Sequence, residues 1–402
     1  MSKNPVSIDQ ALESLRRNVT PLESEEVTLS DACCRILRQP VFGDRDMPPF
    51  DRVMMDGIAI RYKKTTDQWR LQGTQYAGDD PVSLDNHQAC VEIMTGSVLP
   101  DGADTVVPVE DYTIEDNRVL LNKSAKVKKG QFVHLRGAVS HKGDCLIAPP
   151  VVLDGRNLAL CASVGLTHLK VARKPGIAFV STGNELVDSD STPDGAQIRL
   201  TNDRLVGSEL HKLGLSLDQK HHLPDDRESI LDLLNRLKQE QDLIVFSGGV
   251  SKGRADFIAT CVWEAGFEVL FHGILQKPGG PLLAAKHPSG TLVLGMPGNP
   301  ISSLVCTRLY LRSILSILYG WPARVRKVSV SGKTSFPGSK ARLLPVKLVE
   351  DEKKGTVAKI VDSVTSDNML GVLNSDGFVR IPVDEQKDAS KKRVYDYFDW
   401  AL

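Results

Sequence analysis

The chain has 402 residues, of which 41% are hydrophobic, so it can bury several cores and is expected to fold as roughly two to four domains. Fifty basic and fifty acidic side chains leave no net charge, which argues against a general nucleic-acid binder. Seven cysteines without a Cys-x-x-Cys pair argue against a disulfide framework and a thiolate zinc site, and a first segment without an apolar signal region adds to the expectation of a cytoplasmic protein with no membrane association.

The N-terminal segment, residues 1–41, predicts short elements that cannot enclose a core by themselves. Ser7 and Gln10 are spaced as a capping box at the start of an amphipathic helix. Residues 144–174 return to mixed helix and strand and are expected to complete this piece as one discontinuous α/β domain. The predicted elements are helices over 7–19, 30–37 and 153–163 and a strand over 26–29.

Between these two segments, residues 42–143 contain short apolar runs separated by Gly, Asp, Asn and Pro. Such runs are typical of strands joined by turns, so this region is expected to be an inserted, mostly β domain. The runs lie at 58–60, 91–94, 105–109, 119–121 and 132–133.

A third region, residues 175–322, alternates apolar strands with helices, which predicts an α/β domain with a parallel-rich sheet. Asp225 and Glu228 are spaced as a second capping box, whereas Asn299 and Pro300 suit the N-cap and first position of a long helix. The predicted elements are strands over 176–181, 215–220, 242–246 and 291–295 and helices over 202–213, 225–240, 256–265 and 300–318.

The last region, residues 323–402, contains short alternating runs that predict a small C-terminal domain of the β-barrel type. The fold class predicted for the whole chain is therefore multidomain, with α/β and β parts. The most apolar helical stretch, 301–319, contains Arg308 and Arg312, so it is not expected to cross a membrane.

Three of the predicted strands end in glycine-rich loops, at 181–185, 247–253 and 297–300. Glycine permits positive φ and a close approach of the main chain to a ligand, and the amides at a following helix start attract an anion. An ordinary strand-to-helix turn would explain one such loop alone. Because the carboxyl ends of parallel strands line one crevice, we expect the three loops to share one phosphorylated ligand.

Six motifs, in this order along the chain, resemble the landmarks of the molybdopterin molybdenumtransferases, the MoeA family, which includes the E domain of gephyrin. They are Pro49–Gly57 (PFDRVMMDG), Met94–Asp104 (MTGSVLPDGAD), Ser181–Leu186 (STGNEL), Ser247–Ser251 (SGGVS), Lys277–Gly279 (KPG) and Pro297–Pro300 (PGNP). The resemblance implies a homodimer that binds adenylylated molybdopterin, inserts molybdate and releases AMP with the help of Mg²⁺. It also names the adenylyltransferase of the same pathway as a candidate partner.

The resemblance implies catalytic roles for four carboxylates, and Mg²⁺ coordination for the last three of them: Asp56, Glu185, Asp226 and Asp256. Carboxylates can hold a divalent ion against the charge that develops when a phosphoanhydride breaks. Each has a structural alternative, because Asp225 or Asp226 could cap a helix, Asp256 could cap the next one, and Asp56 could shape a turn.

The resemblance also implies residues that contact the pterin nucleotide or molybdate. Lys277 is a candidate contact for phosphate or molybdate, with a solvated loop lysine as the alternative, and Arg136 could contact an anion from the β domain. The predicted binding residues are Arg136, Thr182, Gly183, Ser247, Gly248, Gly249, Ser251, Lys277, Pro297, Gly298, Asn299, Arg342 and Ser366.

The sequence departs from the family pattern at three places. Ala138-Val139 stands where the family commonly has Glu-Asp, and Arg254 stands where it has an acid. Gly280 replaces a lysine after the Lys277-Pro-Gly motif. These changes predict a more positive crevice that holds anions well and Mg²⁺ weakly. An impaired relative that binds the pterin nucleotide without efficient metal insertion, or a scaffold, is therefore the alternative to an active transferase.

Overall fold

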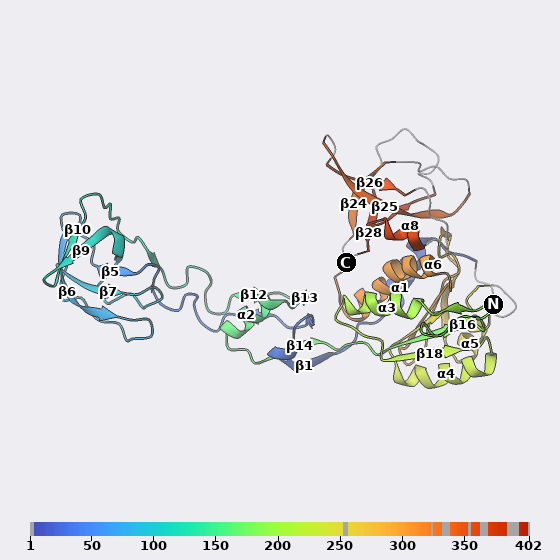
Figure 1. Cartoon of the computed structure of the whole chain (residues 1–402). Coiled ribbons are helices and arrows are strands. Elements are labelled where there is room, and N and C mark those ends of the chain that lie inside the picture. The colour runs from blue at the N-terminus through green and yellow to red at the C-terminus, as the bar shows by residue number, and fades with distance from the viewer. Residues whose placement is uncertain are drawn as a thin grey trace. The chain divides into compact units, whose positions relative to one another are not determined.

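The computed structural model describes residues 4–251, 256–322, 325–331, 338–352, 355–361, 369–383 and 394–400 (Figure 1). The chain divides into a larger unit, made of Met1–Arg38, Pro150–Asp154 and Leu169–Leu402, and a smaller unit, made of Gln39–Pro149 and Gly155–His168. The domain boundaries expected from the sequence divide the chain more finely, and we keep them as a proposal.

A mixed sheet forms the centre of the larger unit, and in the described residues its strand order is β18-β15-β19-β23-β22-β20. The first four strands are parallel, and β22 and β20 are antiparallel additions. The carboxyl ends of the parallel strands therefore share one edge, which confirms the predicted parallel-rich sheet. The strands are β15 (Ile177–Thr182), β18 (Gln219–Leu223), β19 (Leu243–Ser247), β20 (Glu268–His272), β22 (Leu283–Lys286) and β23 (Leu292–Met296).

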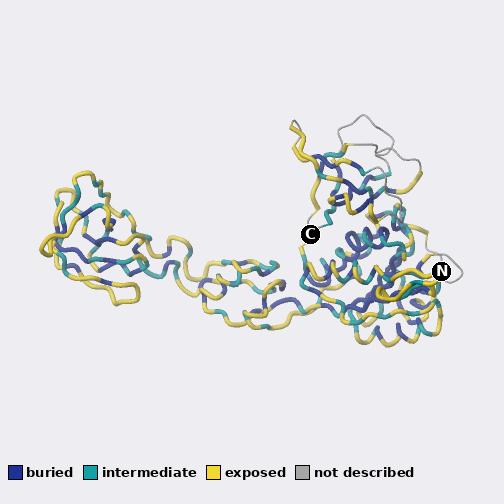
Figure 2. The backbone as a smooth tube through the Cα atoms, in the orientation of Figure 1, coloured by how far each residue is buried: buried dark blue, intermediate teal, exposed yellow. Residues whose placement is uncertain are grey.

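Helices cover both faces of this sheet. Every residue of β15, β19 and β23 is buried, in keeping with the buried stretches of the backbone (Figure 2). Alternate side chains of these strands belong to two different core clusters. One cluster includes side chains from α1, α3 and the helix after β23, and the other includes side chains from α4 and α5. Burial on both faces explains the continuous apolar runs in these strands. The helices are α1 (Ile8–Asn18), α3 (Asn202–His211), α4 (Arg227–Glu240) and α5 (Ile258–Glu264).

The long helix after β23 begins as predicted. Asn299 is its N-cap, with Oδ1 accepting from the Ser302 N–H, and Pro300 is its first residue. The helix runs as α6 (Pro300–Cys306), a π-helical segment η3 (Thr307–Leu311) and α7 (Arg312–Leu318). By length and composition Pro300–Leu318 could span a membrane, but 72% of its most apolar window is buried inside the protein, as befits a core helix.

The N-terminal segment packs against elements far along the chain, as the sequence predicted. Ser7 and Gln10 form the capping box of α1, whose apolar side chains join the core cluster that also contains α7. After α1, the strands pair in the order β1-β14-β2-β13, so segments near positions 30 and 160 form one sheet. The strands are β1 (Ser24–Thr28), β2 (Ile36–Leu37), β13 (Val151–Val152) and β14 (His168–Ala172).

The predicted helix over 30–37 is wrong. A 3-10 turn at Leu29–Asp31 is followed by a reversal in which Cys34 has φ +61, a left-handed value that stops helix propagation. Leu37 then pairs with Val151 and Val171, so pairing with distant strands overrides the local helical pattern. The predicted strand over 215–220 also differs, because β18 begins only at Gln219.

The C-terminal region is a small barrel, in agreement with the predicted β-barrel type. Among its described residues the order is β25-β26-β24-β28-β27, and an added pairing between β27 and β25 closes the ring. The short strand β21 (Gln276–Lys277) joins β25 in parallel from the α/β region. The barrel elements are β24 (Arg326–Ser331), β25 (Ala341–Asp351), β26 (Gly355–Ile360), α8 (Met369–Leu373), β27 (Gly377–Ile381) and β28 (Val394–Asp399).

The smaller unit is mostly β, as predicted. Its described strands form a sheet in the order β8-β5-β7-β6-β10-β9, with two short strand pairs and one helix. The elements are β3 (Val41–Phe42), β4 (Arg52–Val53), β5 (Gly57–Ile60), β6 (Gln68–Gln75), β7 (Ala89–Ile93), β8 (Thr105–Pro108), β9 (Tyr112–Glu115), β10 (Arg118–Leu121), β11 (Val133–His134), β12 (Cys145–Ile147) and α2 (Gly155–Ser163).

Candidate functional site

The three glycine-rich loops lie together at one edge of the central sheet. Ser181 is in register with Ser247 on the neighbouring strand, and Ser247 is in register with Met296 on the next. Each of these strands therefore ends at the same level. The loops that follow them meet, as the sequence predicted from the parallel arrangement.

Two glycines after β19 occupy positions where no side chain fits. Gly248 has φ +97, and a Cβ there would lie 2.5 Å from the main-chain oxygen of Thr182. Gly249 has φ +63, and its Cβ would lie 2.9 Å from both the Thr182 hydroxyl and the Ile258 side chain. Glycine is therefore required by the close packing of adjacent loops as well as by the backbone conformation.

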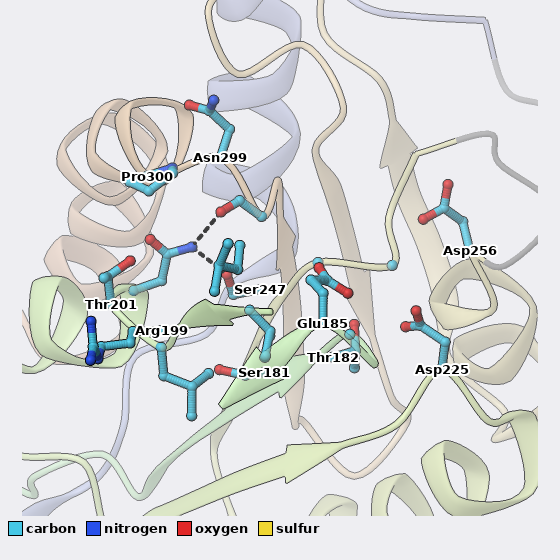
Figure 3. A pocket seen from close by; sticks show the side chains of 18 residues that line it. Ser181, Thr182, Glu185, Arg199, Thr201, Asp225, Ser247, Asp256, Asn299 and Pro300 are labelled. Atoms are coloured by element: carbon cyan, nitrogen blue, oxygen red, sulfur yellow. Dashed lines mark hydrogen bonds between the residues drawn. The ribbon is translucent and has the colours of Figure 1, made fainter. Parts of the chain in front are cut away.

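Asn202, the first residue of α3, ties two of the loops together. Its side-chain nitrogen donates to Ser247 Oγ and to the main-chain oxygen of Gly298, each at 2.8 Å (Figure 3). The side-chain oxygen of Asn202 and the hydroxyl of Thr182 are buried without a hydrogen-bond partner among the described residues. Buried polar atoms are normally paired, so these two atoms are exceptions in the packing behind the loops.

The loops enclose a cavity of about 610 Å³, a size that suits a small-molecule ligand. Its lining combines main-chain groups of glycine, small hydroxyls and a few charged side chains (Figure 3). The lining residues are Ser181, Thr182, Gly183, Glu185, Leu186, Ile198, Arg199, Leu200, Thr201, Asn202, Asp225, Ser247, Gly248, Gly249, Asp256, Gly298, Asn299 and Pro300.

Opposite charges occupy opposite sides of this cavity. Asp225 and Asp256 lie on one side with Glu185 beside them, and Arg199 lies across the cavity from both aspartates (Figure 3). Burial raises the pKa of Asp225 above its ordinary value, and the negative charges of Glu185 and Asp256 raise it further, against a main-chain hydrogen bond from Asn184 that lowers it. Asp225 is therefore both partly buried and repelled by the other two carboxylates.

The described lining residues do not include the positions where the sequence departs from the family pattern, so the expected gain in positive charge stays a prediction. They comprise three carboxylates and one arginine. Arg254, on which the expectation partly rested, lies outside the described residues. In the part of the chain that the structure describes, no three His, Cys, Asp or Glu side chains converge closely enough to form a ready metal site.

Nine of the residues predicted as ligand or metal contacts line the cavity. They are Thr182, Gly183, Glu185, Ser247, Gly248, Gly249, Asp256, Gly298 and Asn299. Ser251 and Pro297 belong to the same loops but are not among the lining residues. The loops were therefore recognisable from the sequence, whereas the direction of each side chain was not.

Asp226 lies at the start of a helix and is not among the residues that line the cavity. It is the N-cap of α4, with Oδ2 accepting from the N–H of Ser229 at 2.8 Å and from its hydroxyl at 2.7 Å. These hydrogen bonds lower the pKa of Asp226. The predicted capping box of Asp225 and Glu228 is therefore wrong by one residue, and Asp225 lines the cavity instead.

Asp56 and Arg136 lie in the smaller unit and have partners there. Asp56 accepts hydrogen bonds from the main-chain N–H and the hydroxyl of Thr95, and these lower its pKa. Arg136 forms an ion pair with Asp46, with 2.6 Å between Nε and Oδ2. Asp56 thus has structural contacts of the kind that the sequence left open as its alternative, and Arg136 has an acidic partner that the sequence did not predict.

Lys277 and Arg342 do not line the cavity, but the structure brings them together. They are register partners on the parallel strands β21 and β25. Side chains of register partners project from the same face of a sheet, so Lys277 and Arg342 lie on one face where the α/β region meets the barrel. Ser366, predicted to share this region, lies outside the described residues.

Sequence reasoning missed Arg199, Thr201, Asn202 and Asp225. The first three come from the segment that enters α3, a short strand β17 (Ile198–Arg199) followed by the helix start. In the sequence these residues form a polar segment between a strand and a helix. The segment contains no glycine, so it resembles many ordinary turns.

These features define a class of protein. An open α/β sheet with glycine loops and helix starts at the carboxyl ends of its parallel strands has the architecture with which doubly wound proteins bind anionic, nucleotide-like ligands. The sequence matches two family models in the corresponding regions. One, described as the MoeA N-terminal region (domain I and II), matches residues 6–165, and the other, described as a probable molybdopterin binding domain, matches residues 178–316.

Relatives extend the match over the whole chain. A molybdopterin molybdenumtransferase of Synechocystis sp. is 30% identical over 399 residues, covering 98% of this chain and 100% of that protein. Another, of Synechococcus elongatus, is 32% identical and covers 77% of this chain and 80% of that protein. The crystal structure of a molybdopterin biosynthesis MoeA protein from Pyrococcus horikosii is 28% identical, with a TM-score of 0.80 over 99% of this chain and 100% of that one. The chain belongs to the molybdopterin molybdenumtransferase family, the MoeA family.

Proposed function

We propose that this chain is a transferase of molybdenum cofactor biosynthesis that inserts molybdate into adenylylated molybdopterin and releases AMP. The observation that best supports this function is the cavity at the ends of β15, β19 and β23, where neighbouring atoms leave no room for a side chain at Gly248 or Gly249. The names of the relatives support the same activity. The cavity volume of about 610 Å³ is large enough for a substantial part of a pterin nucleotide.

The residues of the cavity have distinct proposed tasks. The main chain of Gly248 and Gly249 approaches phosphate oxygens, and the amino end of α6 adds the partial positive charge of a helix start. Asn202 keeps the loops after β19 and β23 in place.

Mg²⁺ fits the chemistry of one side of the cavity. Glu185, Asp225 and Asp256 offer oxygen ligands, and burial together with the charges of the other two carboxylates raises the pKa of Asp225, a cost that a cation would offset. We propose these three carboxylates as its ligands, with Asp225 in place of Asp226. When bound, the ion would supply positive charge opposite the oxygens of the phosphoanhydride.

Molybdate is proposed to bind first at the basic pair formed by Lys277 and Arg342. Two adjacent cations of this kind attract an oxyanion, and arginine supplies a planar set of donors. Ser366 is kept as a proposed third contact. Asp56 and Arg136 are kept as proposed contributors from the smaller unit.

A homodimer in the cytoplasm is the proposed state of the protein, and the adenylyltransferase that supplies its substrate is the proposed partner. The family resemblance supports both proposals. Light scattering of the purified protein should give twice the chain mass of 44.0 kDa. A monomer mass that does not change with concentration would contradict the dimer.

The activity is tested by supplying adenylylated molybdopterin, molybdate and Mg²⁺ to the purified chain. AMP release that depends on molybdate, together with active cofactor, is the expected result. Complementation of cells that lack their own family enzyme tests the same activity in vivo. Failure of both experiments with a folded, ligand-binding protein would contradict the transferase.

A relative that binds the nucleotide without efficient metal insertion is the second candidate. It is favoured by Ala138-Val139, which carry no carboxylate, and by the lack of a converged three-ligand metal site among the described residues. A variant that combines Ala138→Glu, Val139→Asp and Arg254→Glu separates the two candidates. If only this variant turns over, the natural chain is a binding protein; if the natural chain turns over at a similar rate, the changes merely tune the site.

A further inference from the structure

The turn that carries Lys277 is organised by a side chain that the proposed function does not use. Gln276 precedes Lys277 on β21 and is 1% exposed, whereas Lys277 is exposed. Neighbouring residues of a strand face opposite sides, so Gln276 points inward where Lys277 points outward. The main chain closes the turn through the Ile274 N–H, which donates to the Gly280 oxygen at 2.8 Å.

Both polar atoms of the Gln276 side-chain amide form hydrogen bonds. Its side-chain nitrogen donates to the main-chain oxygens of Pro278 at 3.0 Å and Gly279 at 3.1 Å. Its side-chain oxygen accepts from the hydroxyl of Tyr310. The carbonyls can only accept and the hydroxyl can donate, so these partners fix the orientation of the amide.

Tyr310 connects the hydrogen bonds of Gln276 to the long helix whose first residues line the cavity. It lies in the π-helical segment η3 and is fully buried. Burial raises its pKa well above the ordinary value, so the hydroxyl remains a donor at all working pH values. Gly279 seats the turn against the same helix, because a Cβ there would lie 2.7 Å from Cys306 Sγ and 2.8 Å from the Gln276 side-chain nitrogen.

We infer that Gln276 and Tyr310 are positioning residues for the oxyanion site formed by Lys277 and Arg342. Gln276 holds the main chain that follows Lys277, at Pro278 and Gly279, and Tyr310 holds Gln276. A lysine holds an oxyanion as a point charge on a flexible stem, so the place of its main chain decides whether it reaches the same anion as Arg342. This inference rests on the proposed role of the basic pair.

The test compares Tyr310→Phe and Gln276→Met with the natural protein. Both changes keep the buried volume and remove hydrogen bonds. The KM for molybdate should rise roughly tenfold in Tyr310→Phe and further in Gln276→Met, as expected for the loss of one or more buried hydrogen bonds. The Kd for the pterin nucleotide, measured without molybdate, should stay within about twofold, since a tenfold change would need a further lost contact.

Tyr397→Phe is the matched control. Tyr397 is also buried, and its hydroxyl donates to a main-chain oxygen, that of Asp376, at 2.9 Å in the barrel. It should lower thermal stability without changing the KM for molybdate. A purely structural role of Gln276 and Tyr310 predicts the same behaviour for their variants, and that result would overturn the inference.

Lys277→Ala distinguishes this inference from the proposed site itself. If Lys277→Ala raises the KM for molybdate and folded Gln276→Met does not, the positioning role is wrong and the oxyanion site stands. If Lys277→Ala leaves molybdate use unchanged, the oxyanion site is wrong and the positioning role falls with it. A parallel rise in all three variants, with Tyr397→Phe unaffected, supports both.

Discussion

The side-chain nitrogen of Asn202 lies 2.8 Å from Ser247 Oγ and holds the start of α3 against the end of β19. The same nitrogen donates to the Gly298 oxygen, so one amide joins three segments of the cavity wall. The geometry of the cavity therefore depends on a residue that belongs to none of the three glycine loops.

Asn202→Ala should weaken both folding and ligand binding. The change leaves the Gly298 oxygen without this donor, and an unsatisfied buried group costs about 1–3 kcal/mol. Urea unfolding measures the loss of stability, and calorimetry with AMP measures affinity, which should fall at least tenfold. Asn235→Ala, on the exposed surface of α4, is the control and should change neither quantity. Unchanged AMP affinity in folded Asn202→Ala would place the nucleotide elsewhere.

Gly249→Val should abolish binding of the pterin nucleotide. The new side chain would meet Ile258 and Thr182 at 2.9 Å and would displace the main chain that approaches phosphate. Binding is measured by calorimetry on protein whose fold is verified by circular dichroism. The control is Gly290→Ala, since Gly290 also has positive φ, +102, but a Cβ there meets nothing within 4 Å. Affinity in folded Gly249→Val as high as in Gly290→Ala would show that the nucleotide does not approach Gly249.

Asp225→Asn should be more stable than the natural chain at neutral pH, and the difference in the free energy of unfolding should be smaller at acidic pH. The folded-state pKa of Asp225 is raised, so its favourable contribution is fully present below its ordinary pKa of 3.8 and is lost as pH rises through the raised value. The free energies of unfolding of the two proteins should therefore diverge with rising pH. A constant difference at all pH values would show that Asp225 does not experience the charges of Glu185 and Asp256.

The same variant reports on Mg²⁺ without an activity assay. Mg²⁺ should raise the melting temperature of the natural chain, because a ligand that binds only the folded state stabilises it, and should raise that of Asp225→Asn less. The matched control is Asp226→Ala, which loses the α4 cap but none of the proposed ligands. Its melting temperature should be lower, with an undiminished response to Mg²⁺.

Arg308→Met should destabilise the protein strongly. Arg308 Nη1 lies 2.7 Å from Glu209 Oε2, with side-chain exposures of 3% and 8%, and breaking a buried pair typically costs about 3–5 kcal/mol. Adding Glu209→Leu should recover part of the loss in urea unfolding, because the buried carboxylate that Arg308 neutralised is then gone, although Lys212 loses its ion pair with Glu209. Arg17→Ala removes an exposed ion pair on α1 and should have little effect. Additive losses in the double variant would contradict this account.

The sequence alone determined those features that depend on local backbone chemistry. Ser7 and Asn299 were recognisable as helix caps because a cap requires a side-chain acceptor at one position of a short pattern. The glycine loops at 247–249 and 297–299 were recognisable because positive φ and close approach favour one residue type. Parallel strands then required these loops to meet at one edge.

Tertiary structure decided what a linear pattern leaves open. Asp225 and Asp226 are adjacent and chemically alike, and only the orientation of α4 turned one into the cavity and used the other as a cap. Residues 30–37 have a helical pattern, but pairing of Leu37 with distant strands supplies hydrogen bonds that a local helix cannot outweigh. Asn202 became part of the site because its partners, 45 and 96 residues further along the chain, reach it only after the sheet has assembled.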